Sequence, residues 1–179
     1  MARRIIFTKF ASMKRISVII TMAICLLSCG LFSHKPKGEL TYCSYRSNGA
    51  AGLGTDYCQL IAEADSLPRV VVVLNENNRF GDPVIRRSYS VDKSVVDSLA
   101  KILMDAKVYK LNGYNVNEPI CGGHSHNLDI AYSSGDKVSA FWYGNKIKKE
   151  AWSAYRMIEN FFAPWRKMAA EDEKNSNKE

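Results

Sequence analysis

Most of the predicted strands are joined by links that are too short for parallel crossovers, and this spacing limits the fold more than any other feature. Arg69–Leu74 (RVVVVL) is the strongest strand, because consecutive β-branched residues favour an extended backbone. The links are mostly shorter than the dozen or so residues that a parallel connection needs. We therefore expect antiparallel hairpins. The predicted strands are 40–46, 56–64, 69–74, 84–91, 127–133 and 137–143.

Two amphipathic helices complete the pattern. Asp92–Lys107 carries apolar residues at spacings of three and four, and Asp92 can cap its first turn. The second helix runs from about Lys149 to Phe162, and Pro164 is expected to end it. The sequence predicts an α+β fold, an antiparallel sheet of about five to six strands with two helices packed on one face. A parallel α/β fold is the alternative.

The amino terminus has the pattern of an export signal. Lys14 and Arg15 precede an apolar run over 16–27 (ISVIITMAICLL), which is too short to cross a bilayer of about 30 Å. The run ends in Leu-Leu-Ser-Cys, which resembles a bacterial lipoprotein processing site. This resemblance implies removal of residues 1–28 and lipidation of Cys29. An uncleaved anchor and an ordinary secretion signal are the alternatives, and Met13 is an alternative start.

Domain boundaries follow from this assignment. We expect a lipidated tether over 29–38, a single α+β domain over 39–167 and a disordered charged tail over 168–179.

Residues 1–28 hold five basic and no acidic side chains, so their removal lowers the formal net charge from +7 to +2. The basic character therefore belongs mostly to targeting, and no nucleic-acid partner is expected. We expect the lipid to anchor the protein to a membrane of the bacterial cell envelope. A tether without acidic residues favours a periplasm-facing position.

The cysteines that remain after processing are Cys43, Cys58 and Cys121, besides the lipidated Cys29. An odd number outside the cytoplasm indicates one disulfide and a spare thiol, or three buried thiols. If Arg46 pairs with Thr55 in a hairpin, Cys43 lies directly opposite Cys58 and a disulfide can form. A short helix at 57–64 would abolish that bridge.

One segment concentrates side chains able to bind metal or attack a substrate, namely Cys121, His124 and His126. In an extended segment both histidines share one face, and Asp129 could add a fourth ligand. The same residues could form a Cys-His nucleophilic pair. A glycine turn leading into a strand, with half-exposed histidines, is the interpretation that we expect for this segment. No established enzyme motif occurs in the sequence, so we expect no cofactor and no catalysis.

An aromatic run lies on the last predicted strand. Alternation sends Phe141 and Tyr143 to one face and Trp142 to the other. Because one face of a two-layer sheet can stay open, Trp142 and Tyr143 are the candidate binding-surface residues, with ordinary core packing as the alternative.

The layout from Thr41 to Trp165 resembles small envelope lipoproteins of the Bacteroidota type. The motifs are Leu-Leu-Ser-Cys at 26–29, Tyr-Arg-Ser-Asn-Gly-x-x-Gly at 45–52, Ser90-Val-Asp92 and Phe162-x-Pro-Trp165. The glycine hairpin followed by Val-Asp and a helix is also similar to emfourin, a proteinaceous inhibitor of metallopeptidases. That similarity covers half of the domain, with Arg69–Leu74 as an insertion.

These observations together predict a cell-envelope lipoprotein with a non-enzymatic binding domain. Its expected partner is an envelope protein or peptide. The alternative function is a metal- or thiol-dependent enzyme centred on Cys121, His124 and His126.

Overall fold

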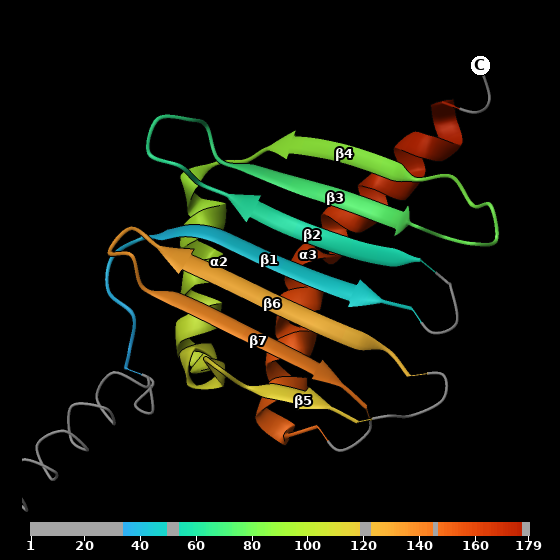
Figure 1. Ribbon diagram of the computed structural model, residues 1–179. Helices are drawn as coiled ribbons and strands as arrows, with labels where there is room; N and C mark the ends of the chain where they lie inside the picture. The colour runs from blue at the N-terminus through green and yellow to red at the C-terminus, as the bar shows by residue number, and fades with distance from the viewer. Residues whose placement is uncertain (1–33, 50–53, 119–122, 145–146, 177–179) are drawn as a thin grey trace, which may run out of the picture. The chain divides into compact units, whose positions relative to one another are not determined.

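The computed structural model describes residues 34–49, 54–118, 123–144 and 147–176. The chain divides into two units, Met1–His34 and Lys35–Glu179, and every element described below belongs to the second (Figure 1). In chain order these elements are β1 (Leu40–Asn48), β2 (Thr55–Ile61), β3 (Arg69–Glu76), β4 (Ile85–Ser90), α2 (Lys93–Asp105), the 3-10 helix η2 (Val108–Leu111), β5 (Asn115–Asn117), β6 (Ser125–Tyr132), β7 (Lys137–Tyr143) and α3 (Lys149–Ser176).

The strands form one sheet in the order β4-β3-β2-β1-β6-β7-β5. Every neighbouring pair is antiparallel except β5 and β7, which run parallel. The predicted α+β class is therefore confirmed, with seven strands instead of five to six. The extra strand, β5, has only three residues, too few for an alternating pattern to be recognised in the sequence.

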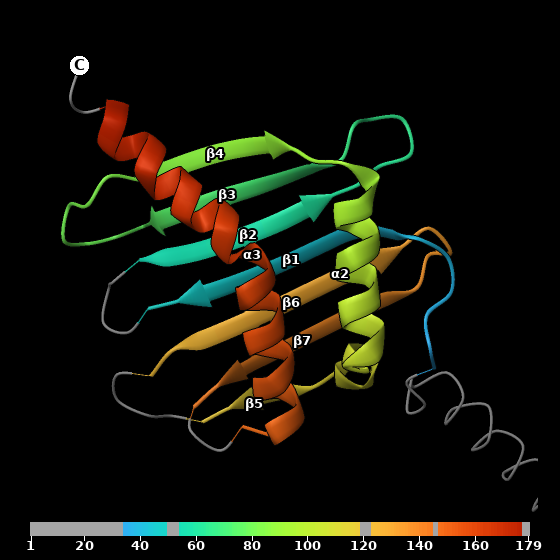
Figure 2. The ribbon, with the colours of Figure 1, turned by 180° about the vertical axis from the view of Figure 1, so that it is seen from behind.

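The core lies between one face of the sheet and the two helices, which cover the same side (Figure 2). Along β6 the buried positions alternate strictly with half-buried ones, as expected for a strand with one covered face. Val96, Leu99 and Leu103 of α2 and Ile158 and Phe162 of α3 fill the layer from the other side. Asp92 occupies the position before α2, but its side chain makes no capping hydrogen bond.

Helix α3 does not end at Pro164, contrary to the sequence prediction; it continues to Ser176. A proline inside a helix costs about 3 kcal/mol, because it removes a hydrogen bond and clashes with the preceding turn. Burial on both sides offsets this cost, since Phe162 and Ala169 are completely buried. The predicted disorder over 168–179 is therefore wrong for residues 168–176.

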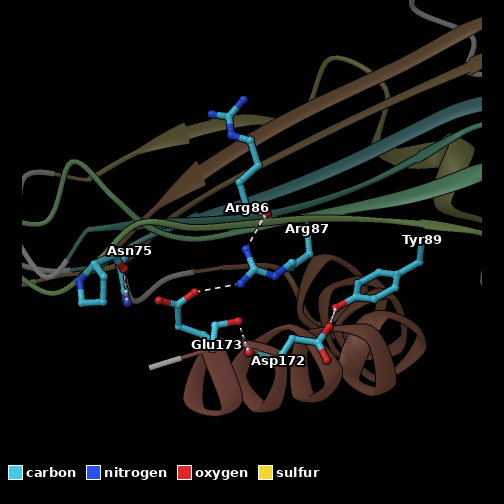
Figure 3. Close-up of polar contacts among 8 residues, drawn as sticks. Asn75, Arg86, Arg87, Tyr89, Asp172 and Glu173 are labelled. Atoms are coloured by element: carbon cyan, nitrogen blue, oxygen red, sulfur yellow. Dashed lines mark hydrogen bonds and ion pairs between the residues drawn. The ribbon is translucent and has the colours of Figure 1, made fainter. Parts of the chain in front are cut away.

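The last turns of α3 are fastened to the edge strand β4. Figure 3 shows Arg87 and Tyr89 pointing from β4 to the helix, where Arg87 donates to Glu173 at 2.9 Å and Tyr89 to Asp172 at 2.9 Å. Arg87 also donates to the carbonyl of Arg86 at 3.1 Å. The charged tail predicted from the sequence is thus part of the domain.

The register between β1 and β2 differs from the one that would allow a disulfide. Asn48, and not Arg46, pairs with Thr55, which places Cys43 opposite Leu60 and Cys58 opposite Tyr45. The two cysteines are diagonal neighbours, about 7–8 Å apart in such a sheet, beyond the reach of a disulfide. Both are free and buried, so the predicted bridge is wrong.

Side-chain hydrogen bonds that join three neighbouring strands explain this register. They keep β1 paired as far as Asn48, two residues beyond its predicted end at Arg46. The side chain of Asn48 accepts a hydrogen bond from Thr55 and donates one to Ser125, each at 2.8 Å.

The start of the domain is held against the β6–β7 turn. The backbone N–H of Lys37 donates to Asp136 at 2.8 Å, and that of Glu39 donates to Ser133 at 2.9 Å. Gly38 has a φ of +77°, and a Cβ there would lie 2.5 Å from Ser133 Oγ, so a glycine is required. Within the described residues, no helix combines the length and the apolar character needed to span a bilayer.

Candidate functional site

The face of the sheet opposite the helices carries the candidate binding surface, which we call the open face. The helices lie on the other side in both views (Figures 1 and 2). Side chains of a strand alternate between the two faces, so each strand contributes every second residue to the open face. Because the strands are in register, these residues form rows that cross the sheet.

One such row spans all seven strands, and we call it the central row. Its members occupy successive paired positions from one sheet edge to the other. They are Arg86 (β4), Val73 (β3), Tyr57 (β2), Arg46 (β1), Asn127 (β6), Phe141 (β7) and Asn115 (β5). Arginine, tyrosine and phenylalanine are types enriched in protein interfaces. Arg46 and Tyr57 are neighbours in the row, and Asn127 separates Arg46 from Phe141. Val73 and Tyr57 are buried, so Arg46 is the exposed group at the middle of the row.

Arg46 lies at the middle of this row. Its guanidinium carbon lies 5.2 Å from the ring centroid of Tyr57, a cation–π contact that directs the side chain over the neighbouring strand. Arg46 is exposed, and no carboxylate among the described residues forms an ion pair with it. A positioned cation is therefore available to a partner.

The acidic groups of the open face, Asp129 and Glu76, both make contacts within it, although only Glu76 is in an ion pair. Asp129 accepts hydrogen bonds from Asn127 at 3.0 Å and from Ser139 at 2.8 Å. Glu76 pairs with Arg86 at 3.3 Å. Arg69 and Lys137 add exposed positive charges at the strand ends nearest the start of the domain. The open face consequently favours a partner that carries acidic groups.

An open cleft of about 910 Å³ meets the central row at Asn115. Lys110, Lys148 and Glu150 contribute its charged side chains, and Tyr114 lies beneath Lys148, whose Nζ is 5.2 Å from the ring centroid. The cleft lies at the β5 edge of the sheet, between η2, β5 and the start of α3, and not on the open face itself.

The predicted metal or thiol site is not brought together within the described residues. Cys121 lies outside them. His124 is exposed just before β6, whereas His126 is buried on the helix-covered face. Asp129 lies on the opposite face of the same strand, where Asn127 and Ser139 bind it. Over the described ranges, no group of three or more His, Cys, Asp or Glu side chains could hold a metal ion.

His126 is instead part of an aromatic cluster beneath α3. Four rings lie close to it, with centroid distances of 4.6 Å for Tyr155, 5.5 Å for Trp142, 5.9 Å for Trp152 and 6.2 Å for Tyr45. Burial, assisted by the neighbouring charge of His124, lowers the pKa of His126 to about 4. His126 is therefore neutral near pH 7 and acts as a packing residue.

The two aromatic residues predicted to form a binding surface, Trp142 and Tyr143, lie on opposite faces of the sheet. Tyr143 is half-buried on the open face, beside the central row. Trp142 is completely buried on the covered face, so its assignment to a binding surface is wrong. Its Nε1 has no hydrogen-bond partner among the described residues. The open-face neighbour that the prediction should have included is Phe141.

Arg46 and Tyr57 were missed by sequence reasoning, although alternation along β1 and β2 assigns each to the face opposite the buried cysteines. Only the register aligns them with Asn127 and Phe141. No protein-family model and no curated protein matches this chain.

Proposed function

We propose that this protein is a lipid-anchored binding protein of the bacterial cell envelope, facing the periplasm, and that its open face binds an envelope protein or peptide bearing acidic groups. The observation that carries the proposal is the central row, in which Arg46 forms no ion pair with a described residue, contacts the ring of Tyr57 on one side and has the amide of Asn127 on the other. The similarity of layout to emfourin supports a protein partner.

The aromatic and guanidinium groups suit this role physically. Tyrosine, phenylalanine and arginine supply large contact areas and are frequent among the residues that dominate binding energy. Arg46 is already oriented by Tyr57, so little side-chain entropy is lost when it meets a carboxylate. Charge complementarity of this kind raises association rates and gives specificity.

Binding by the open face is tested with two charge-reversal variants. Crosslinking in intact cells identifies the partner, and its affinity for the purified domain is then measured. Arg46→Glu should weaken binding at least tenfold, because it opposes the acidic groups of the partner. Arg156→Glu makes the same charge change at an exposed position of α3 and should alter affinity less than twofold. Equal effects of both variants would reject the open face as the binding surface.

Anchoring is tested separately by Cys29→Ala. The variant should leave the membrane fraction or accumulate unprocessed, because the lipid attachment site is lost. Unchanged membrane retention together with a normal mature size would contradict lipidation.

A further inference from the structure

The β3–β4 loop, residues 77–84, concentrates exposed apolar side chains. Phe80 is 68% exposed and Val84 is 54% exposed, and they are two of the five large apolar side chains in the described residues that lie open to solvent. Both belong to this one loop, and an exposed phenylalanine in a loop is a candidate contact residue, whereas single exposed aliphatic residues are ordinary.

Side-chain hydrogen bonds within the loop fix its backbone on both sides of Phe80. The N–H of Phe80 donates to Asn78 Oδ1 at 2.7 Å, and Asn78 Nδ2 donates to Asp82 at 2.6 Å. Asn75 Nδ2 donates to the carbonyl of Pro83 at 3.2 Å, which closes the base of the loop. Asn75 and Asn77 both have a φ of 59°, a left-handed conformation that asparagine tolerates. The exposed ring is therefore presented by an ordered loop.

The base of the loop is fixed to the rest of the domain. The N–H of Asn75 donates to Asp56 Oδ1 at 3.0 Å, and Asp56 Oδ2 accepts a hydrogen bond from Arg166 of α3 at 2.6 Å. The base of the loop is thus anchored to β2 directly and to α3 through Asp56. A preorganised loop loses little conformational entropy when it binds.

The charge of the loop indicates the chemistry of its partner. Glu76 is paired with Arg86, and Asp82 keeps its charge but is directed to the side-chain amide of Asn78. Arg79, adjacent to Phe80, is exposed and forms no ion pair with a described residue. The loop therefore offers an exposed aromatic ring next to a cation that forms no ion pair within the described ranges.

The position of the loop agrees with such a role. The register places the end of β3 at the same end of the sheet as the end of β1, so residues 77–84 lie at the end opposite the tether junction at Lys37 and Glu39 (Figure 1). We propose that Phe80 and Arg79 dock into an apolar pocket rimmed by carboxylates on another envelope protein. This inference rests on the proposed function in assuming an envelope protein as partner, but it concerns a different surface.

The test uses the full chain in the bacterium that makes it. A photoreactive benzoylphenylalanine replaces Phe80 in one strain and Leu67 in another. Leu67 is 78% exposed in the β2–β3 loop, at the end of the sheet where the tether joins the domain, and serves as the matched control. Illumination should give a discrete protein adduct from position 80 and none from position 67. Adding Arg79→Glu should lower the yield of the adduct at least fivefold, because the acidic rim would repel it.

Purified partner then gives a quantitative measurement. Phe80→Ser should raise the dissociation constant at least tenfold, and Leu67→Ser should change it less than twofold. Both side chains are exposed, so both variants should melt within a few degrees of the wild type. No adduct at position 80, equal adducts at both positions, or an adduct insensitive to Arg79→Glu would overturn the inference. If Arg46→Glu abolishes binding and Phe80→Ser does not, the loop inference fails while the proposed function stands.

Discussion

Tyr45 of β1 and His126 of β6 share a hydrogen bond of 2.9 Å between Oη and Nδ1, inside the layer between the sheet and α3. Burial raises the pKa of Tyr45, so its hydroxyl keeps its proton at every ordinary pH. His126 is 4% exposed and has its pKa lowered to about 4 by burial. The pair is therefore neutral, and it joins two neighbouring strands beneath the helix.

This neutral histidine predicts a defined loss of stability in mild acid. An unfolded histidine titrates near 6.5, so between about pH 6.5 and pH 4 the unfolded chain binds a proton that the folded chain does not. Stability from this site is complete above pH 6.5 and falls as the pH drops to 4. Between pH 7 and pH 4.5 the free energy of unfolding of the wild type should decrease by about 2 kcal/mol more than that of His126→Phe.

Urea denaturation at several pH values measures this difference. His124→Gln is the control, because His124 is exposed and only its charge acts on His126. It should keep most of the pH dependence. The same slope in His126→Phe and the wild type would show that His126 is not the titrating group.

Cys43 and Cys58 should behave as buried thiols. Burial is the main cause that raises the pKa of each to about 12. The thiolate is the reactive form, so iodoacetamide at pH 8 should leave both unmodified in the folded protein and modify both after unfolding. Peptide mapping by mass spectrometry reads each site. A Cys43–Cys58 disulfide in non-reduced peptides would contradict the register described above.

The ion pair between Asp56 and Arg166 should contribute more than a surface pair of equal length. Its separation is 2.6 Å, and both side chains are about two-thirds buried, at 34% and 31% exposure. Asp56→Asn should lower the free energy of unfolding by about 1 kcal/mol, because half-buried charged hydrogen bonds are strengthened by the lower local dielectric. Chemical denaturation measures this loss.

Asp105→Asn is the matched control for that variant. The Lys101–Asp105 pair is also 2.6 Å long, but its side chains are 77% and 63% exposed. Its removal should cost clearly less than removal of the Asp56 charge, because water screens an exposed pair. Equal costs at the two sites would refute the role assigned to burial.

The carboxyl-terminal turns of α3 should stabilise the edge strand β4. Truncation after Ala170 removes Asp172 and Glu173, the partners of Tyr89 and Arg87. We expect a loss of about 1–2 kcal/mol and faster amide hydrogen exchange in β4, with little change in the central strand β6. Truncation after Ser176 is the control and should change neither property. Unaltered exchange in β4 after the longer truncation would mean that these contacts do not hold the edge.

Local patterns in the sequence were sufficient for much of the fold. The consecutive valines of β3, the alternation along β6 and β7 and the apolar stripe of α2 each reflect a backbone period within one element. Such periods depend only on neighbouring residues, so the hairpins, the helices and the α+β class could be predicted. The predicted export signal and the predicted lipidation of Cys29 rest on the same kind of local pattern.

The tertiary structure decided what depends on residues far apart in the chain. The ladder from Thr55 through Asn48 to Ser125 sets a register two residues away from the predicted one, which separates Cys43 from Cys58 and builds the central row. Contacts with β4 accompany the continuation of α3 beyond Pro164, and pairing with β7 makes a strand of β5. Packing against α3 turns His126 into a core residue. Each outcome depends on burial and pairing energy between distant segments, which no local pattern records.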